Sequence, residues 1–256
     1  MDGILQAPAA TAFDAASSVV SLLVYLGVAV ACIVRSPRDS RSRVFLAVAI
    51  CSAVPYGLSP LQWWKGNGVY TPGVIAETAI AFTVGSVALF HFTQVFPARR
   101  PWIATYGFWL TAAYVLLPIP VAAIAWVLGS LLGPAADAGA AGLGAVSVDG
   151  AEAIVMLLMI PVIFVVGLVL PFAGVMSLFK SWQEAKRSGD AAARGATLWM
   201  LMSQMGGGVL SVLVLPLLHL AGVGAPWSLL IAALAYAFAL LLPAAYLRYA
   251  TVSTSA

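Results

Sequence analysis

The sequence predicts an all-α, polytopic membrane bundle of about seven transmembrane helices, with its N-terminus outside and its C-terminus in the cytoplasm. Hydrophobic residues make up 62% of the chain and charged residues 8%, whereas a soluble domain holds roughly 45–50% and about 25%. A span needs about 20 mostly apolar residues, so a chain of this length holds about seven spans with their connections. Basic residues also gather in alternate connections, which indicates a fixed orientation.

Apolar runs, interrupted by charges or by clusters of Gly and Pro, place the spans. The runs are continuously apolar instead of alternating, which favours helices over a barrel. The expected spans are residues 17–34, 44–59, 73–96, 103–129, 154–179, 196–220 and 226–247. The corresponding divisions are an outer N-terminal segment at 1–16, the seven-helix transmembrane domain at 17–248 and a short cytoplasmic tail at 249–256.

The positions of Lys and Arg predict the orientation, because basic residues near the ends of spans are retained on the cytoplasmic side. Lys65 is the one basic residue expected on the outer side. The remaining basic residues follow the odd-numbered spans: Arg35, Arg38, Arg41, Arg43, Arg99, Arg100, Lys180, Lys186, Arg187, Arg194 and Arg248. The positive net charge therefore reflects the basic residues expected on the cytoplasmic side and gives no reason to expect binding of nucleic acid.

Two outer connections differ in composition. Residues 55–73 hold aromatic side chains between turn-forming residues, which suits an interfacial segment with its rings at the level of the lipid headgroups. These aromatic residues are Tyr56, Trp63, Trp64 and Tyr70. They serve either as membrane anchors or as the wall of an outward-facing ligand cavity. Residues 130–150 are rich in Gly and Ala and predict a flexible surface loop.

The residues required by several membrane activities are missing from the expected positions. A retinal Schiff base needs a Lys inside the last span, and that span has none. His91 and His219 are expected near opposite membrane faces, so they cannot share one haem iron. No metalloprotease motif or phosphate-binding loop occurs. We therefore expect no enzyme activity, no metal and no cofactor, although bound membrane lipid is compatible with the sequence.

Glu77 and Gln204 are the polar side chains within the spans that the sequence singles out. Glu77 is the one acid in the expected spans, about one turn below the outer surface, and burial of its charge requires a partner. It either pairs with Lys65, or anchors a ligand or senses protons beside Trp63, Trp64 and Tyr70. Gln204 lies deeper, where its amide either joins helices or contacts a ligand.

Glycines and prolines mark places where the helices bend or approach closely. Gly206, Gly207 and Gly208 follow one another near the expected bilayer midplane. Three glycines in succession permit either close helix packing or a conformational hinge. Prolines interrupt two other spans, at Pro118 and Pro120 in the fourth and at Pro161 and Pro171 in the fifth.

Three stretches together carry a family resemblance. They are ALFHFTQVFPARRPW at 88–102, the loop 180–195 that runs into ATLWMLM, and LLPAAYLRYATVS at 241–253. The chain resembles the seven-helix membrane module at the N-terminus of many bacterial sensor histidine kinases and serine phosphatases. In that family a catalytic domain follows the last span, whereas this sequence ends shortly after Arg248. The resemblance implies a role in signal input at the bacterial inner membrane, and no catalytic output.

The leading hypothesis is a non-enzymatic, sensor-like membrane protein that signals to a separate cytoplasmic or membrane partner. Arg99, Arg100, Arg187 and Arg248 are the expected partner contacts on the cytoplasmic side. The alternative is a structural or accessory subunit of a larger respiratory or photosynthetic membrane complex. A small transporter or channel is disfavoured because the spans hold few charged or carboxamide residues to line an aqueous path.

Overall fold

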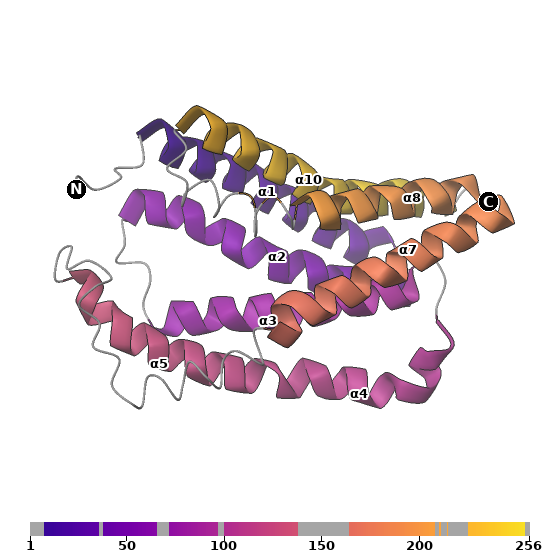
Figure 1. Ribbon diagram of the computed structural model, residues 1–256, viewed down its shortest axis with the longest axis horizontal. Helices are drawn as coiled ribbons and strands as arrows, with labels where there is room; N and C mark the ends of the chain where they lie inside the picture. The colour runs from indigo at the N-terminus through magenta and orange to yellow at the C-terminus, as the bar shows by residue number, and fades with distance from the viewer. Residues whose placement is uncertain are drawn as a thin grey trace.

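The protein is a bundle of long helices that run side by side, with its two termini at opposite ends (Figure 1). The computed structural model describes residues 8–35, 38–65, 72–96, 100–137, 164–207, 210, 214 and 225–253, and these contain no β-strand. The expected all-helical class is therefore confirmed for the described part of the chain. The long apolar runs form helices because helical hydrogen bonding satisfies every backbone group without help from water.

Helices of two kinds, α and π, make up the bundle. In chain order they are α1 Pro8–Arg35, α2 Ser40–Lys65, α3 Pro72–Val95, α4 Trp102–Leu116, α5 Pro118–Asp137, the π-helical turn η2 Val165–Val169, α7 Leu170–Ser188, α8 Ala191–Met202, the π-helical turn η3 Ser203–Gly207 and α10 Ala225–Ser253.

Five described stretches are long and apolar enough to cross a membrane. They are Ala15–Val34, Pro72–Val95, Gly107–Val127, Val165–Ser188 and Leu230–Arg248. The expected membrane character of the bundle is thus supported for the first, third, fourth, fifth and seventh expected spans. Helix α2 corresponds to the second expected span, and α8 together with η3 corresponds to the sixth. Neither is among these five stretches.

The fourth expected span is interrupted at its proline, as the sequence predicts. Helices α4 and α5 are separated by the single residue Leu117, whose backbone remains helical and whose N–H donates to the Ala113 carbonyl at 3.2 Å. Pro118 has no backbone N–H to donate, so one hydrogen bond of the helix is missing here. In the fifth span, Pro171 is the second residue of α7, in the first turn after the π-helical turn η2, and Pro161 lies outside the described residues.

The loop expected at residues 180–195 is wrong. Helix α7 continues to Ser188 and α8 begins at Ala191, so the connection is a tight turn at Gly189 and Asp190. Gly189 adopts a left-handed conformation with φ +75°, and the Asp190 carboxylate accepts the Ala193 backbone N–H at 2.9 Å. Charge kept this stretch out of the predicted span, but Lys, Arg, Gln and Glu are good helix formers in water.

The interfacial segment expected at residues 55–73 is also partly wrong. Helix α2 continues through Pro55 and Pro60 to Lys65, so the first part of the segment belongs to the bundle. The Tyr56 ring stacks on Tyr25 of α1, with 5.7 Å between ring centroids. Neighbouring helices tolerate proline within a membrane helix because packing holds the helix through the lost hydrogen bond.

Most of the expected cytoplasmic connections lie at one end of the bundle, which we call the basic end. It carries Arg41 at the start of α2, Arg100 after α3, Arg187 at the end of α7 and Arg248 near the end of α10. Figure 1 shows the C-terminus, the turn between α7 and α8 and the start of α4 together at its right-hand side. The helices thus run in the alternating directions that the pattern of basic residues requires.

Large apolar side chains cover the outside of the bundle. Leu23 and Val34 on α1, and Phe108 and Trp109 on α4, are all more than half exposed. A soluble monomer rarely exposes such surfaces, whereas lipid solvates them without penalty. An exterior of large apolar side chains is therefore that of a protein immersed in a bilayer.

The glycines near the end of α8 allow close packing. Gly206 and Gly207 lie in η3 and face α10, and a methyl group placed on Gly206 would lie 2.6 Å from the nearest ring atom of Phe238. Close helix approach, one of the two expected uses of these glycines, is thus seen directly at Gly206. Their use as a hinge stays a prediction, and Gly208 lies outside the described residues.

We predict that Gly206→Ala destabilises the bundle by about 1–3 kcal/mol, because the added methyl group forces the Phe238 ring or α10 to move. Thermal unfolding in detergent would measure the loss as a lower midpoint. Gly195→Ala in α8 is the matched control, since a methyl group there meets nothing within 4 Å. Equal midpoints for the two variants would contradict the close-packing account.

Candidate functional site

Arg100 joins the end of α3 to the part of α7 that lies at the basic end. Its Nη1 donates to both Glu184 carboxylate oxygens at 2.9 and 3.0 Å, and its Nη2 donates to Ser181 Oγ at 2.8 Å. The Arg100 side chain is 15% exposed and that of Glu184 is 50% exposed. The guanidinium is thus largely withdrawn from solvent, where its ionic and hydrogen-bonded contacts are stronger than those of a fully exposed pair.

Gln94, near the end of α3, is the second polar centre. Its buried side chain donates to Thr93 Oγ1 and accepts the indole N–H of Trp102, both at 3.1 Å. Its backbone carbonyl accepts the Arg100 N–H at 2.9 Å. Ser177 of α7 adds a hydrogen bond to the Thr93 carbonyl at 3.1 Å. Together these contacts fix α3, the start of α4 and α7 against one another.

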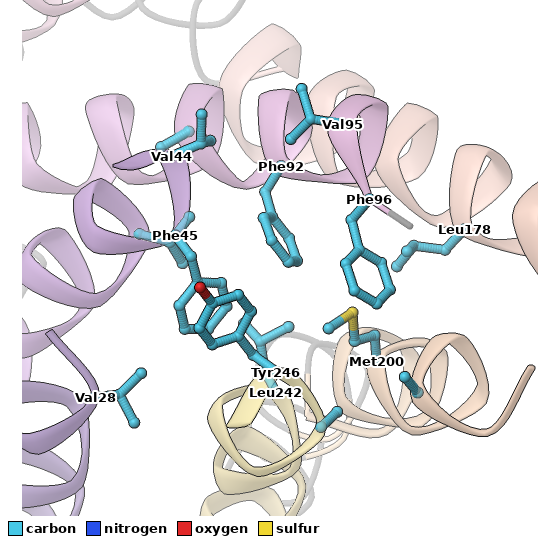
Figure 2. Close-up of a cluster of buried hydrophobic side chains, with 14 of the residues drawn as sticks. Val28, Val44, Phe45, Phe92, Val95, Phe96, Leu178, Met200, Leu242 and Tyr246 are labelled. Carbon is cyan, nitrogen blue, oxygen red and sulfur yellow. The ribbon is translucent and has the colours of Figure 1, made fainter. Parts of the chain in front are cut away.

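An aromatic cluster packs beside this polar network (Figure 2). Phe45 of α2 stacks on Tyr246 of α10, with 4.2 Å between centroids and 7° between planes, while Phe92 meets both rings edge-on. The Tyr246 hydroxyl and Ser42 Oγ are hydrogen-bonded at 2.6 Å. Figure 2 shows Phe96 pointing toward Leu178 and Met200, which extends the cluster to α7 and α8. Helices from both halves of the sequence are therefore joined at the basic end.

The expected partner contacts occupy different environments. The Arg100 guanidinium contacts Glu184 and Ser181 within the protein, and its role as a partner contact stays a prediction. Arg187 is exposed at the end of α7. Arg248 is exposed as well and lies over the Trp199 ring of α8, 5.7 Å from its centroid. Arg99 lies outside the described residues.

The expected ligand site of the sequence analysis is not assembled among the described residues. Glu77 is exposed on α3 and makes no hydrogen bond or ion pair with another described residue. Gln204 is half-buried in η3, and its amide likewise finds no described partner. Tyr70 and the side chains of Trp63 and Trp64 lie outside the described set. The proposed roles of these residues stay predictions.

Sequence reasoning missed the residues that the structure joins most closely. Gln94 lies in the motif that carries the family resemblance, but its burial was not anticipated. The available signal was a carboxamide within an apolar helix, followed closely by a Trp whose N–H needs an acceptor. Glu184 could not be recognised from the sequence, because no sequence pattern indicates that it lies next to Arg100.

We predict that Gln94→Leu destabilises the protein by about 1–3 kcal/mol, because it leaves the half-buried Trp102 N–H without its acceptor. Gln204→Leu is the matched control, since Gln204 has no hydrogen bond to lose among the described residues. Its unfolding midpoint should stay near that of the wild type. A larger loss in Gln204→Leu than in Gln94→Leu, measured by thermal unfolding in the same detergent, would reverse the assignment of the polar centre.

Comparisons with protein-family models, with curated proteins and with solved structures find no match to this chain. The resemblance to the membrane module of bacterial sensors therefore stays a prediction from the sequence.

Proposed function

We propose that this chain is a seven-span, sensor-like protein of the bacterial inner membrane that signals to a separate partner at its cytoplasmic face. Its basic end is cytoplasmic, its N-terminus is outside and its action is not enzymatic. Support comes from the apolar exterior, from the placement of basic residues at one end and from the sequence resemblance. The observation that carries the proposal is the set of contacts that Arg100 makes with Glu184 and Ser181 of α7, which we call the Arg100 bridge.

The Arg100 bridge provides a mechanical connection from the membrane helices to the basic end. Arg100 is tied to the end of α3 by its backbone hydrogen bond to Gln94, and it contacts α7 through Glu184 and Ser181. A helix of 24 residues, the length of Val165–Ser188, is about 36 Å long against a hydrocarbon core of about 30 Å. The last turn of α7 therefore extends beyond the core, and a displacement of α3 would reach it through Arg100.

The α7–α8 hairpin, residues 180–194, is the surface we assign to the partner. Lys180, Lys186, Arg187 and Arg194 are all exposed on it. Its turn is rigid because Gly189 and Asp190 cap the two helices. A rigid, basic surface binds an acidic partner with a small entropy loss and with long-range electrostatic attraction.

The proposed orientation predicts that a cytoplasm-only fluorescent reporter fused to the C-terminus is active. A periplasm-only phosphatase fused at the same position should be inactive, because the basic end is retained in the cytoplasm. The two fusions are compared at equal expression. Phosphatase activity of the C-terminal fusion would show that the proposed orientation is inverted.

We predict that the intact protein, purified in mild detergent, retains a kinase or regulator whose binding depends on the hairpin. Arg187→Glu should lower the retained amount several-fold, because it reverses a charge at the proposed contact. Arg187→Lys is the control, since it keeps the charge and should keep the partner. Mass spectrometry identifies and quantifies what is retained.

The same purification tests the accessory-subunit alternative. A stoichiometric set of respiratory or photosynthetic subunits, retained equally by wild type and Arg187→Glu, would contradict a signalling role for the hairpin. It would favour packing through the exposed apolar faces of α1 and α4 instead.

A further inference from the structure

A second polar region lies on the faces where α1 meets α2 and α10, in the half of the bundle away from the basic end. We call it the tyrosine seam and define it as Ser18, Ser21, Tyr25, Tyr56 and Tyr236. The three residues on α1 are spaced by three and four positions, which places them on one face of the helix. Figure 1 shows α1 between α2 and α10 along this half.

Direct contacts connect the members of the seam. Ser18 Oγ and the Tyr236 hydroxyl are hydrogen-bonded at 3.1 Å, and the Tyr25 hydroxyl donates to the Ala239 carbonyl at 3.1 Å. The Tyr56 ring lies 5.7 Å from Tyr25 and 6.1 Å from Tyr236, measured between centroids. Three helices thus bring three aromatic rings and their hydroxyl groups to one place.

Ser21 is the feature that these contacts leave unexplained. Its side chain is 0% exposed, and its Oγ is the one buried side-chain polar atom without a hydrogen-bond partner among the described residues. It lies one turn from Ser18 and one turn from Tyr25 on the same face. A buried hydroxyl without a partner is costly, more so in a membrane where water does not compensate. The half-buried Tyr56 hydroxyl also makes no hydrogen bond to a described residue.

We propose that the tyrosine seam binds a neutral, membrane-soluble ring compound with carbonyl oxygens, of the quinone type. Its carbonyl oxygens would accept from the Ser21 and Tyr56 hydroxyls, which have no acceptor among the described residues. The aromatic rings give the ligand ring an apolar contact surface. None of the five seam residues is charged, so the ligand is neutral, because an unpaired buried charge would be far more costly.

The packing of the seam limits how this ligand lies. The Tyr25 and Tyr56 rings are stacked on each other, so the ligand ring packs against the seam and not between these two rings. Tyr56 and Tyr236 are only partly buried and can be reached from the lipid side, whereas Ser21 is fully covered, so a ligand carbonyl reaches Ser21 Oγ only when the side chains that cover it move aside. The proposal names an input ligand for the proposed function and rests on that function only for its signalling consequence. Binding itself is measured without any partner.

The experiment titrates the purified full chain in detergent with decylubiquinone and follows the thermal unfolding midpoint. We expect a saturable rise in the midpoint of the wild type. Ser21→Ala and Tyr56→Phe should each weaken binding by about tenfold, the effect of one lost hydrogen bond. Ser21→Ala should fold at least as stably as the wild type without ligand, because it removes a buried hydroxyl that has no partner. Decylbenzene, which has the ring and chain but no carbonyl, should give no saturable rise.

Two control variants separate the seam from the rest of the protein. Ser203→Ala removes a buried serine of η3, and Tyr114→Phe removes a hydroxyl that is hydrogen-bonded to His91 at 3.2 Å. Both should bind decylubiquinone like the wild type. The proposal is overturned if the wild type shows no saturable rise, or if Ser21→Ala and Tyr56→Phe bind as tightly as the controls. Quinone binding without a captured partner would leave the seam standing and refute the signalling role alone.

Discussion

The placement of one guanidinium group governs how the two halves of this membrane protein meet. Arg100 lies between the end of the long apolar helix α3 at Val95 and the start of α4 at Trp102, and its charge cannot enter the hydrocarbon without a partner. It finds that partner in Glu184, on a helix that is distant in sequence. The bridge requires α7 to continue as a helix past the hydrocarbon edge, because a flexible loop would not hold Glu184 in position. The same requirement places Ser177 and Ser181 against the end of α3.

The helical class and the side-by-side arrangement could be predicted because they depend on composition and on backbone hydrogen bonding alone. The limits of the helices could not. Helix α7 extends to Ser188 and α2 to Lys65, both past the span limits of 179 and 59 that the sequence predicts. Lys, Gln and Glu continue a helix readily once it leaves the bilayer, and tertiary packing holds α2 together through Pro55 and Pro60. Hydropathy predicts which residues lie in the hydrocarbon core, and a helix can continue beyond the last of these residues.

The candidate site, too, depends on contacts between helices that a single sequence does not show. Gln204 attracted notice because it lies deep in an apolar run, yet its amide has no partner among the described residues. Gln94 makes three hydrogen bonds through its side chain and backbone. A single sequence states which polar groups are in the membrane, but not which of them meet. The Trp102 indole N–H reaches the Gln94 side chain only because α4 begins close to the end of α3, and this proximity cannot be read from the sequence.

The irregular turns of the bundle lie away from its most heavily bonded end. Helix α7 runs without interruption from η2 to Ser188, and α8 runs from Ala191 to η3. The hairpin is thus the shared end of two regular helices, each of which has a π-helical turn at its other end. Regular helices transmit displacement over their length, whereas π-helical turns are the places where a helix adjusts most readily. The Arg100 bridge holds the α7 side of the hairpin to the end of α3, at the end of α7 opposite its π-helical turn.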